Sequence, residues 1–258
     1  MDSYNVRVLE IEKITHDVLG IRTEKPAGYG FIPGQATEVA VNDKDWVNEK
    51  RPFTFTNLPA DDHLEFTIKT YPAHNGVTNR LLQLKTGDEL IIHDVWGAIN
   101  YKGKGLFIAG GAGITPFISI FRYLKSINDT EGNRLLFANK TRKDIILEAE
   151  LNSLLRGNVI NILSEEDVKG YKHGFITEQI LKDLMDPTDA VLFMRSSPND
   201  RWGYKKPGQP WCIRKVGGHG SVIIRGDGSS LKSAARLLLP EIFIIGGRAV
   251  NRRHINII

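Results

Sequence analysis

The chain has 258 residues, with 34 Lys and Arg against 30 Asp and Glu and a formal net charge of +4. Its single cysteine, Cys212, excludes a disulfide framework and an iron–sulfur cluster held by four cysteines of this chain. No apolar run approaches the roughly 20 residues that a membrane-spanning helix requires, and the first residues lack the basic-then-apolar profile of a signal peptide. We therefore expect a cytoplasmic protein with room for two domains, no membrane association and no nucleic-acid partner.

Residues 4–100 contain short stretches in which apolar and polar side chains alternate, as in strands with one buried face. The clearest of these stretches are 4–11, 36–41, 64–70 and 89–94. Turn signals separate them, at Pro33-Gly34, at 59–62 and at 86–88. Short strands at this spacing predict an antiparallel β-barrel, which we place at residues 1–102.

One further alternating stretch, Arg51-Pro52-Phe53-Thr54-Phe55-Thr56, carries a cation, an aromatic ring and a hydroxyl. An arginine suits a diphosphate because its guanidinium is always charged and can donate two parallel hydrogen bonds. Phe53 offers a flat face for a ring system, and the Thr54 hydroxyl can hydrogen-bond a ring nitrogen. Taken alone, the stretch could equally be an edge strand with an exposed arginine.

From residue 105 the pattern changes to strands that alternate with helices. The apolar run 106–109 breaks into three glycines and is followed by Thr115-Pro116 and a helical pattern; the glycines are Gly110, Gly111 and Gly113. Glycines let a backbone approach a phosphate, and a helix N-terminus offers free N–H groups, so this turn predicts a dinucleotide site. Pro116 suits a first helical turn. The alternative for the turn alone is a tight turn without a ligand.

The same alternation continues through strands at 134–138 and 159–163 and helices around 144–155 and 177–184. This order predicts a doubly wound parallel α/β domain, which we place at residues 103–193. The five histidines before residue 194 share no metal-ligand spacing, and we expect no metal site.

Together, in this order, the two motifs resemble those of the ferredoxin–NADP reductase superfamily, with the closest likeness to bacterial flavodoxin and ferredoxin reductases. The family's flavin motif is Arg-x-Tyr-Ser/Thr, with Phe53 here in place of the tyrosine, and its nucleotide motif is Gly-x-Gly-x-x-Pro. Residues 68–71 and 76–81 look like its second flavin segment. The resemblance implies FAD binding by Arg51, Pro52, Phe53, Thr54, Lys69, Tyr71, Gly76, Val77 and Thr78, and dinucleotide binding by Gly110, Gly111, Gly113, Thr115 and Pro116. Thr78 could equally be a plain helix N-cap.

The resemblance also implies an NAD(P)H-dependent flavoprotein reductase. In that activity NADH or NADPH passes a hydride to FAD, and electrons then reach a separate carrier protein such as flavodoxin or ferredoxin. Thr54 is the candidate catalytic residue because its hydroxyl can poise the reactive ring nitrogen. The alternative is a flavin-binding protein with impaired turnover, because the family's C-terminal closing element has no match here.

The choice of nicotinamide depends on the loop Ser164-Glu165-Glu166. NADPH-specific members of the family tend to place Ser-Arg there, against the 2′-phosphate. Two carboxylates repel a phosphate, whereas a ribose hydroxyl can donate to one of them, so the loop leans toward NADH. The alternative is a solvated acidic loop with no ligand.

Beyond residue 194 the sequence changes character. Residues 1–194 carry a net charge of −5, whereas residues 195–258 carry +9. The family continues with Cys-Gly-Pro-Pro-Pro-Met, but this chain reads Met194-Arg195-Ser196-Ser197-Pro198. Codons for these residues, read from their second base, permit Cys-Gly-Pro-Pro-Pro. We therefore hypothesise that 194–258 is an irregular, out-of-frame basic tail; the alternative is a genuine tail whose codons only permit that reading.

Overall fold

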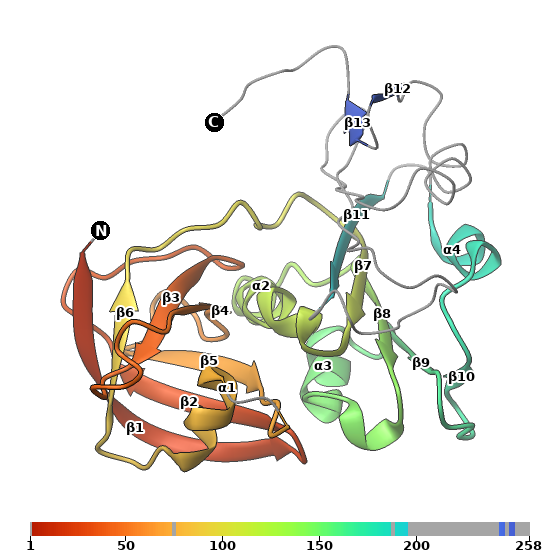
Figure 1. Ribbon diagram of the computed structural model, residues 1–258. Helices are drawn as coiled ribbons and strands as arrows, with labels where there is room; N and C mark the ends of the chain where they lie inside the picture. The colour runs from red at the N-terminus through yellow and green to blue at the C-terminus, as the bar shows by residue number, and fades with distance from the viewer. Residues whose placement is uncertain (1, 74–75, 187–188, 196–242, 246–247, 251–258) are drawn as a thin grey trace. The chain divides into compact units, whose positions relative to one another are not determined.

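The computed structural model describes residues 2–73, 76–186, 189–195, 243–245 and 248–250 (Figure 1). By their contacts these residues form two compact units. The first unit holds residues 1–101, 112–130 and 143–157, and the second holds 102–111, 131–142 and the residues from 158 onward. In the described part of the chain, no helix is long and apolar enough to cross a bilayer.

The first unit is built on a six-stranded antiparallel sheet with the order β4-β3-β6-β1-β2-β5. A backbone bridge between Phe55 and Phe66 joins the segment after β4 to β5, so the sheet closes on itself almost completely. The predicted antiparallel barrel is therefore confirmed. Its strands are β1 (Ser3–Thr15), β2 (Val18–Glu24), β3 (Ala36–Val41), β4 (Arg51–Thr54), β5 (His63–Lys69) and β6 (Glu89–His93).

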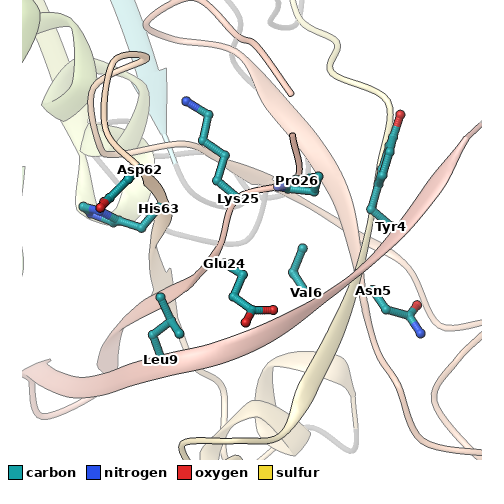
Figure 2. A pocket seen from close by; sticks show the side chains of 9 residues that line it. All are labelled: Tyr4, Asn5, Val6, Leu9, Glu24, Lys25, Pro26, Asp62 and His63. Carbon is teal, nitrogen blue, oxygen red and sulfur yellow. The ribbon is translucent and has the colours of Figure 1, made fainter. Parts of the chain in front are cut away.

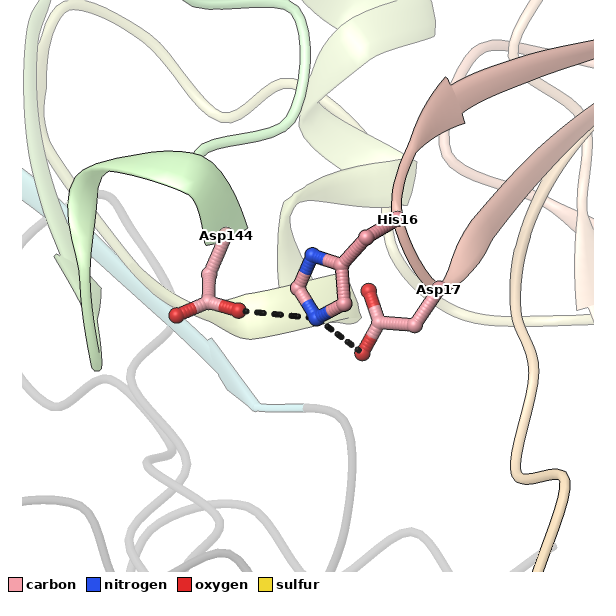
Figure 3. Close-up of side chains that lie close together, drawn as sticks. All are labelled: His16, Asp17 and Asp144. Carbon is pink, nitrogen blue, oxygen red and sulfur yellow. Dashed lines mark ion pairs between the residues drawn. The ribbon is translucent and has the colours of Figure 1, made fainter.

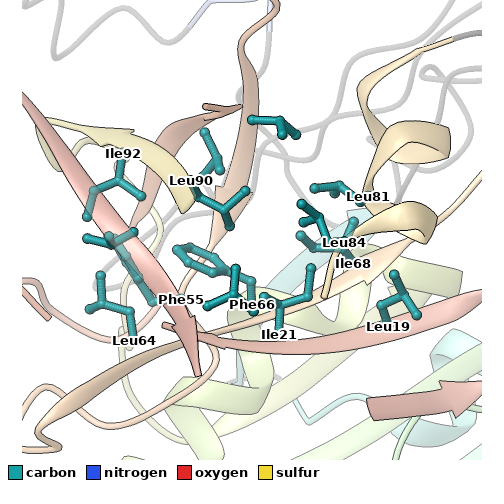
Figure 4. Close-up of a cluster of buried hydrophobic side chains, with 14 of the residues drawn as sticks. Leu19, Ile21, Phe55, Leu64, Phe66, Ile68, Leu81, Leu84, Leu90 and Ile92 are labelled. Atoms are coloured by element: carbon teal, nitrogen blue, oxygen red, sulfur yellow. The ribbon is translucent and has the colours of Figure 1, made fainter. Parts of the chain in front are cut away.

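Alternation puts one side chain of every two inside this barrel, where they form a single apolar core (Figure 4). Phe55 and Phe66 lie at its centre, fully buried, with their ring centroids 5.4 Å apart. A short helix, α1 (Val77–Arg80), followed by the 3₁₀ turn η1 (Leu81–Gln83), closes one side of the core through Val77 and Leu81.

Two further helices belong to the same unit. Helix α2 (Thr115–Ser126) follows the 3₁₀ turn η2 (Gly111–Ile114) without a break, and α3 (Glu148–Leu154) follows the 3₁₀ turn η3 (Arg142–Asp144). Pro116 lies in the first turn of α2, as the sequence predicts. The side of α2 that faces away from solvent is apolar, and its Phe117, Ile118 and Phe121 are fully buried.

The second unit is a five-stranded sheet with the order β10-β9-β8-β7-β11, parallel at every pairing. Its strands are β7 (Gly105–Gly110), β8 (Arg134–Asn139), β9 (Val159–Leu163), β10 (Lys172–His173) and β11 (Ala190–Arg195). Helix α4 (Glu178–Leu184), N-capped by Thr177, contributes Ile180 and Leu181 to an apolar cluster with Leu106 and Ile108 of β7. The predicted parallel α/β sheet is confirmed.

Beyond residue 195 only two short strands are described, β12 (Phe243–Ile245) and β13 (Arg248–Val250), which pair antiparallel. The predicted irregular tail at 194–258 otherwise lies outside the described residues, and the frameshift hypothesis stays a prediction. The domain bounds 1–102 and 103–193 also stay predictions.

Candidate functional site

The flavin motif forms the strand β4 at one end of the barrel sheet. Its residues pair with β3, with Arg51 opposite Val39 and Thr54 opposite Ala36. Exposure falls along the strand: Arg51 and Pro52 are exposed, whereas Phe53 and Thr54 are half-buried and Phe53 packs against the barrel core. A cation, an aromatic face and a hydroxyl therefore follow one another along a single strand.

The guanidinium of Arg51 is accessible, because 48% of its side chain is exposed. Its Nη1 donates to the carbonyl of the neighbouring Lys50 at 2.7 Å, and its Nη2 lies 3.4 Å from Glu49 Oε2. Both contacts are with residues within two positions of it in the chain. An incoming diphosphate would replace an exposed carboxylate contact, and exposed ion pairs of this kind stabilise a protein by about 1 kcal/mol at most.

The second flavin segment forms the start of α1, close to the loop that leads into β4. Arg80 at the end of α1 donates to Asp43 Oδ2 at 3.2 Å, and Asp43 follows β3. The pKa of Asp43 is lowered, first by the backbone N–H of Asp45 and then by Arg80. This ion pair ties the end of α1 to the segment that follows β3, the strand that pairs with β4.

The N-cap of α1 is Gly76, so the alternative role of Thr78 as the N-cap is wrong. Gly76 is extended, with φ −147° and ψ 176°, and its carbonyl accepts from the amides of Asn79 and Arg80. Thr78 is the second residue of the helix, and no side-chain hydrogen bond caps α1. Among the described residues, no side chain accepts from the amides of Val77 and Thr78, which leaves these two amides available to a phosphate oxygen.

Two predicted flavin residues have partners within the barrel. Lys69, the last residue of β5, places its Nζ 3.0 Å from Asp17 Oδ2, and only 19% of each side chain is exposed. Tyr71 is half-buried and also has a partner. A flavin contact from Lys69 would have to compete with this ion pair, so Lys69 is the weakest member of the predicted set.

Asp17 is also part of a cluster of three polar side chains (Figure 3). His16 Nε2 lies 3.8 Å from Asp17 Oδ2 and 3.5 Å from Asp144 Oδ1, which comes from η3. The three ligand atoms lie within 4.8 Å of one another, as in a metal centre. The ammonium of Lys69 already occupies Asp17, however, and a bound cation would have to displace it, so we assign no metal here.

The nucleotide motif begins where β7 ends. Gly110 closes β7, and Gly111 and Gly113 lie in the 3₁₀ turn η2, with Gly111 at φ 53°, a left-handed conformation that favours glycine. Thr115 is the first residue of α2 and Pro116 follows it. The N-cap of α2, Ile114, offers no side-chain hydrogen bond. Because η2 runs into α2 without a break, the glycine turn forms the start of this helical segment, and in the described part of the chain no side chain caps it, an arrangement suited to a phosphate.

The acidic loop follows β9 and is anchored to the end of β8. The amides of Ser164 and Glu165 donate to the carbonyls of Asn139 and Lys140 at 3.0 and 2.8 Å. The two carboxylates differ: Glu165 pairs with Lys140 at 2.9 Å and is more than half exposed, whereas Glu166 accepts from the Arg142 amide at 2.7 Å. Glu165 therefore faces solvent, and Glu166 holds the loop together.

A separate hollow of about 540 Å³ opens on the barrel between β1, β2 and the start of β5 (Figure 2). Its walls include Tyr4, Glu24, Lys25 and His63. The Lys25 ammonium is already held by the carbonyls of Pro59 and Asp61, at 2.6 and 2.9 Å. No residue of the flavin or nucleotide motifs lines this hollow, so it is not the predicted cofactor site.

The site includes residues that the sequence reasoning missed. Ser119 and Arg122 on α2 donate to the backbone carbonyls of Asn57 and Thr56, at 2.8 and 2.9 Å, just after the flavin motif. His93 is buried, and its Nδ1 lies 3.0 Å from the Glu38 carbonyl. Contacts between residues more than 50 positions apart leave no local pattern in the sequence.

Comparison with known families agrees with both motifs. Residues 3–95 match the model of an FAD-binding domain, and residues 107–195 match that of an oxidoreductase NAD-binding domain. The first of these ranges contains the Arg51–Thr54 and Gly76–Thr78 segments, and the second contains most of the glycine turn and the acidic loop.

Individual proteins give the same picture. The chain is 32% identical over 160 residues to the reductase component of propane 2-monooxygenase from Rhodococcus jostii, covering 58% of this chain and 42% of that protein. It is 28% identical to NADH-cytochrome b5 reductase 3 of Rattus norvegicus, covering 76% of this chain and 78% of that protein. The cytochrome b5 reductase domain of Ulva prolifera nitrate reductase has the same fold, with a TM-score of 0.65 and 22% identity over 76% of this chain and 88% of that one.

Proposed function

We propose that this chain, with its FAD-binding and NAD-binding domains, is a member of the ferredoxin–NADP reductase superfamily and an FAD-dependent reductase that takes a hydride from a reduced nicotinamide dinucleotide and delivers electrons to a partner protein. The observation that carries the proposal is the strand β4, which presents an accessible arginine, a half-buried aromatic ring and a threonine in the order that a flavin requires.

The residues present fit FAD. Arg51 can neutralise the diphosphate, because its contacts within the described part of the chain are with Lys50 and Glu49, its neighbours in the sequence. The uncapped amides at Val77 and Thr78 supply hydrogen-bond donors for the phosphates. Phe53 supplies a face for the ring system and holds its position through the barrel core. Replacing the family's tyrosine by Phe53 keeps the aromatic face and removes one hydroxyl contact.

Bound FAD supplies the redox chemistry, since it accepts a hydride and can release electrons one at a time. The protein supplies positions and charges. Thr54, half-buried on β4, would donate a hydrogen bond to the ring nitrogen that receives the hydride. Gly110, Gly111, Gly113, Thr115 and Pro116 form the turn and helix start that would hold the dinucleotide phosphates.

NADH is the proposed nicotinamide. The carboxylate of Glu165 is solvent-exposed at the end of the sheet where ligands of open α/β folds bind, and it would repel a 2′-phosphate. The NADH-cytochrome b5 reductases among the relatives support the same choice. Glu165 is paired with Lys140, so its effect on NADPH is a partial repulsion rather than an exclusion.

The proposed acceptor is a separate one-electron carrier. The relatives named above serve cytochrome b5 and a monooxygenase, and each supports a protein acceptor. Flavodoxin and ferredoxin, implied by the sequence motifs, stay candidates of the same kind. The test measures how fast NADH, in the presence of this protein, reduces purified cytochrome b5, a [2Fe–2S] ferredoxin and a flavodoxin. The three rates rank the three carriers as acceptors. If none is reduced faster than without the protein, the proposed delivery to a carrier protein is wrong.

A second candidate function, flavin binding without useful turnover, follows from the end of the NAD-binding match at residue 195. The sequence loses the family's Cys-Gly-Pro-Pro-Pro-Met there. Both functions predict that the protein retains FAD after desalting. Only the reductase bleaches the flavin rapidly with NADH. A protein that stays colourless after incubation with FAD contradicts both.

A further inference from the structure

A partly buried arginine, Arg122, links helix α2 to three other parts of the first unit. Arg122 Nη1 donates to the Thr56 carbonyl at 2.9 Å and to Glu65 Oε1 of β5 at 2.5 Å. Its Nε and Nη2 donate to the two carboxylate oxygens of Glu150 on α3, at 2.6 and 3.0 Å. Only 21% of the Arg122 side chain is exposed. One guanidinium thus uses three of its nitrogens to hold a strand, a helix and a backbone carbonyl.

The carbonyl that Arg122 binds is directly downstream of the flavin motif. Thr56 is two residues beyond Thr54, and the next carbonyl, that of Asn57, accepts from the hydroxyl of Ser119 at 2.8 Å. Ser119 is fully buried and lies three residues before Arg122, on the same face of α2. Two adjacent carbonyls of one strand extension are therefore bound by two side chains of one helix.

The same helix begins with the nucleotide motif. Thr115 and Pro116 form its first turn, seven and six residues before Arg122, which is a separation of roughly 10 Å along the axis at 1.5 Å per residue. The first turn of α2 and Arg122 belong to the same compact unit, as do residues 56–57 and α3. A rigid helix of two turns joins the predicted dinucleotide contacts to the Arg122 contacts.

The shifts in pKa of Glu65 and Arg122 favour their charged forms. Burial alone would raise the pKa of Glu65, but the charge and hydrogen bonds of Arg122, followed by Thr56 and Arg22, hold it below its usual value. Burial would lower the pKa of Arg122, and Glu150 and Glu65 raise it instead. A buried ion pair adds little stability relative to well-packed apolar residues of the same size, but it fixes geometry. The network is therefore better suited to holding a position than to stabilising the fold.

We infer that Arg122 is a positioning residue, which fixes the helix that carries Thr115 and Pro116 relative to the strand that carries Arg51–Thr54. The inference rests on the proposed function. Hydride transfer requires the two reacting rings at close range, and a displacement of about 1 Å can cost on the order of 100-fold in rate. Loss of the Arg122 contacts should therefore slow flavin reduction without weakening the hold on FAD itself.

The test compares Arg122→Met, which keeps much of the side-chain volume, with Arg122→Lys, which keeps the charge and loses the fork. Arg22→Met is the matched control, because Arg22 Nε lies 3.6 Å from the same Glu65 but comes from β2 and does not contact α2. In Arg122→Met we expect the rate constant of flavin reduction at saturating NADH to fall by about 10- to 100-fold. The FAD dissociation constant should be unchanged, Arg122→Lys should recover part of the rate, and Arg22→Met should behave as the wild type.

Hydrogen exchange on the protein without cofactors supplies a second readout. Arg122→Met should accelerate amide exchange in 56–57 and in 115–122 together, and Arg22→Met should not. The inference would be overturned if Arg122→Met had the same flavin reduction rate and the same amide exchange as the wild type. It would also be overturned if the variant lost FAD affinity by as large a factor as it lost rate. If Arg122→Met fails to fold, Glu150→Gln weakens the same contacts and is measured in its place. A wild type that is not reduced by NADH refutes the proposed function, and the exchange comparison then still decides the role of Arg122.

Discussion

Replacing Glu165 by arginine should shift the protein from NADH toward NADPH. The backbone of this loop is held by the amides of Ser164 and Glu165, which donate to β8 whatever side chain is present. The side chain is 57% exposed and forms a surface ion pair with Lys140, which is worth about 1 kcal/mol at most. The substitution therefore changes charge with little change in fold.

The expected size follows from Coulomb's law. A unit charge about 7 Å from one phosphate charge contributes roughly 0.6 kcal/mol in water. Glu165→Arg changes the local charge by two, a 2′-phosphate carries nearly two charges, and physiological salt removes about half of the effect. The remaining difference of about 1 kcal/mol, together with the release of Lys140, predicts a change of roughly tenfold in the ratio of kcat/KM for NADPH to that for NADH.

Steady-state kinetics with both nicotinamides and a small-molecule electron acceptor measures this ratio. Glu10→Arg is the matched control, since Glu10 is 55% exposed and, like Glu165, forms a surface ion pair, here with Arg22, but lies on the barrel strand β1. The control should leave the ratio unchanged. An unchanged ratio in Glu165→Arg would show that this loop does not face the 2′-position, and the proposed preference for NADH would lose its structural basis.

Three other outcomes are expected. Arg51→Ala should weaken FAD binding by about 10-fold or more, and FMN binding by less, because a charge-assisted contact to the diphosphate is worth roughly 1.5–3 kcal/mol. A fluorescence titration measures both affinities. The control is Arg22→Ala, which should bind FAD normally, since the Arg22 side chain is 48% exposed, as is that of Arg51. Gly105→Ala should destabilise the parallel sheet by about 3 kcal/mol or more, because a Cβ there would lie 2.0 Å from the Ala190 carbonyl oxygen, and a normal melting temperature would contradict the β7–β11 pairing. The folded pKa of Glu65 is below its unfolded value of 4.5, so its ionisation stabilises the fold above that pH, and this contribution is lost as the pH falls through the folded pKa. The difference in unfolding free energy between the wild type and Glu65→Gln should therefore shrink in acid. A difference that is constant with pH would argue against an ionised Glu65.

The elements could be predicted from the sequence because their signals are local. The bounds of β3 are those of the alternating stretch 36–41, and Pro116 lies in the first turn of α2. The apolar run 106–109 ends in glycines, and this signal was sufficient to predict the turn between β7 and α2. In these cases the pattern and the structure depend on neighbouring residues only.

The connections within the site could not be predicted in the same way. Arg122 and Glu65 are 57 residues apart, and Asp144 reaches His16 across 128 positions. The position of Thr78 shows a further limit: a threonine before an apolar run is typical of an N-cap, but Gly76, already extended, takes that position one residue before the helix begins. The local pattern does not tell which of two suitable residues takes the N-cap position.

The most direct measurement is anaerobic stopped-flow mixing of the FAD-loaded protein with NADH. Our account predicts that the flavin absorbance is bleached in a single fast phase at a rate that saturates with NADH, and that Arg51→Ala loses this signal through loss of FAD. A flavin that stays bound and oxidised after mixing, yet is reduced normally by dithionite, would contradict the proposed reductase activity and leave a flavin-binding protein without turnover.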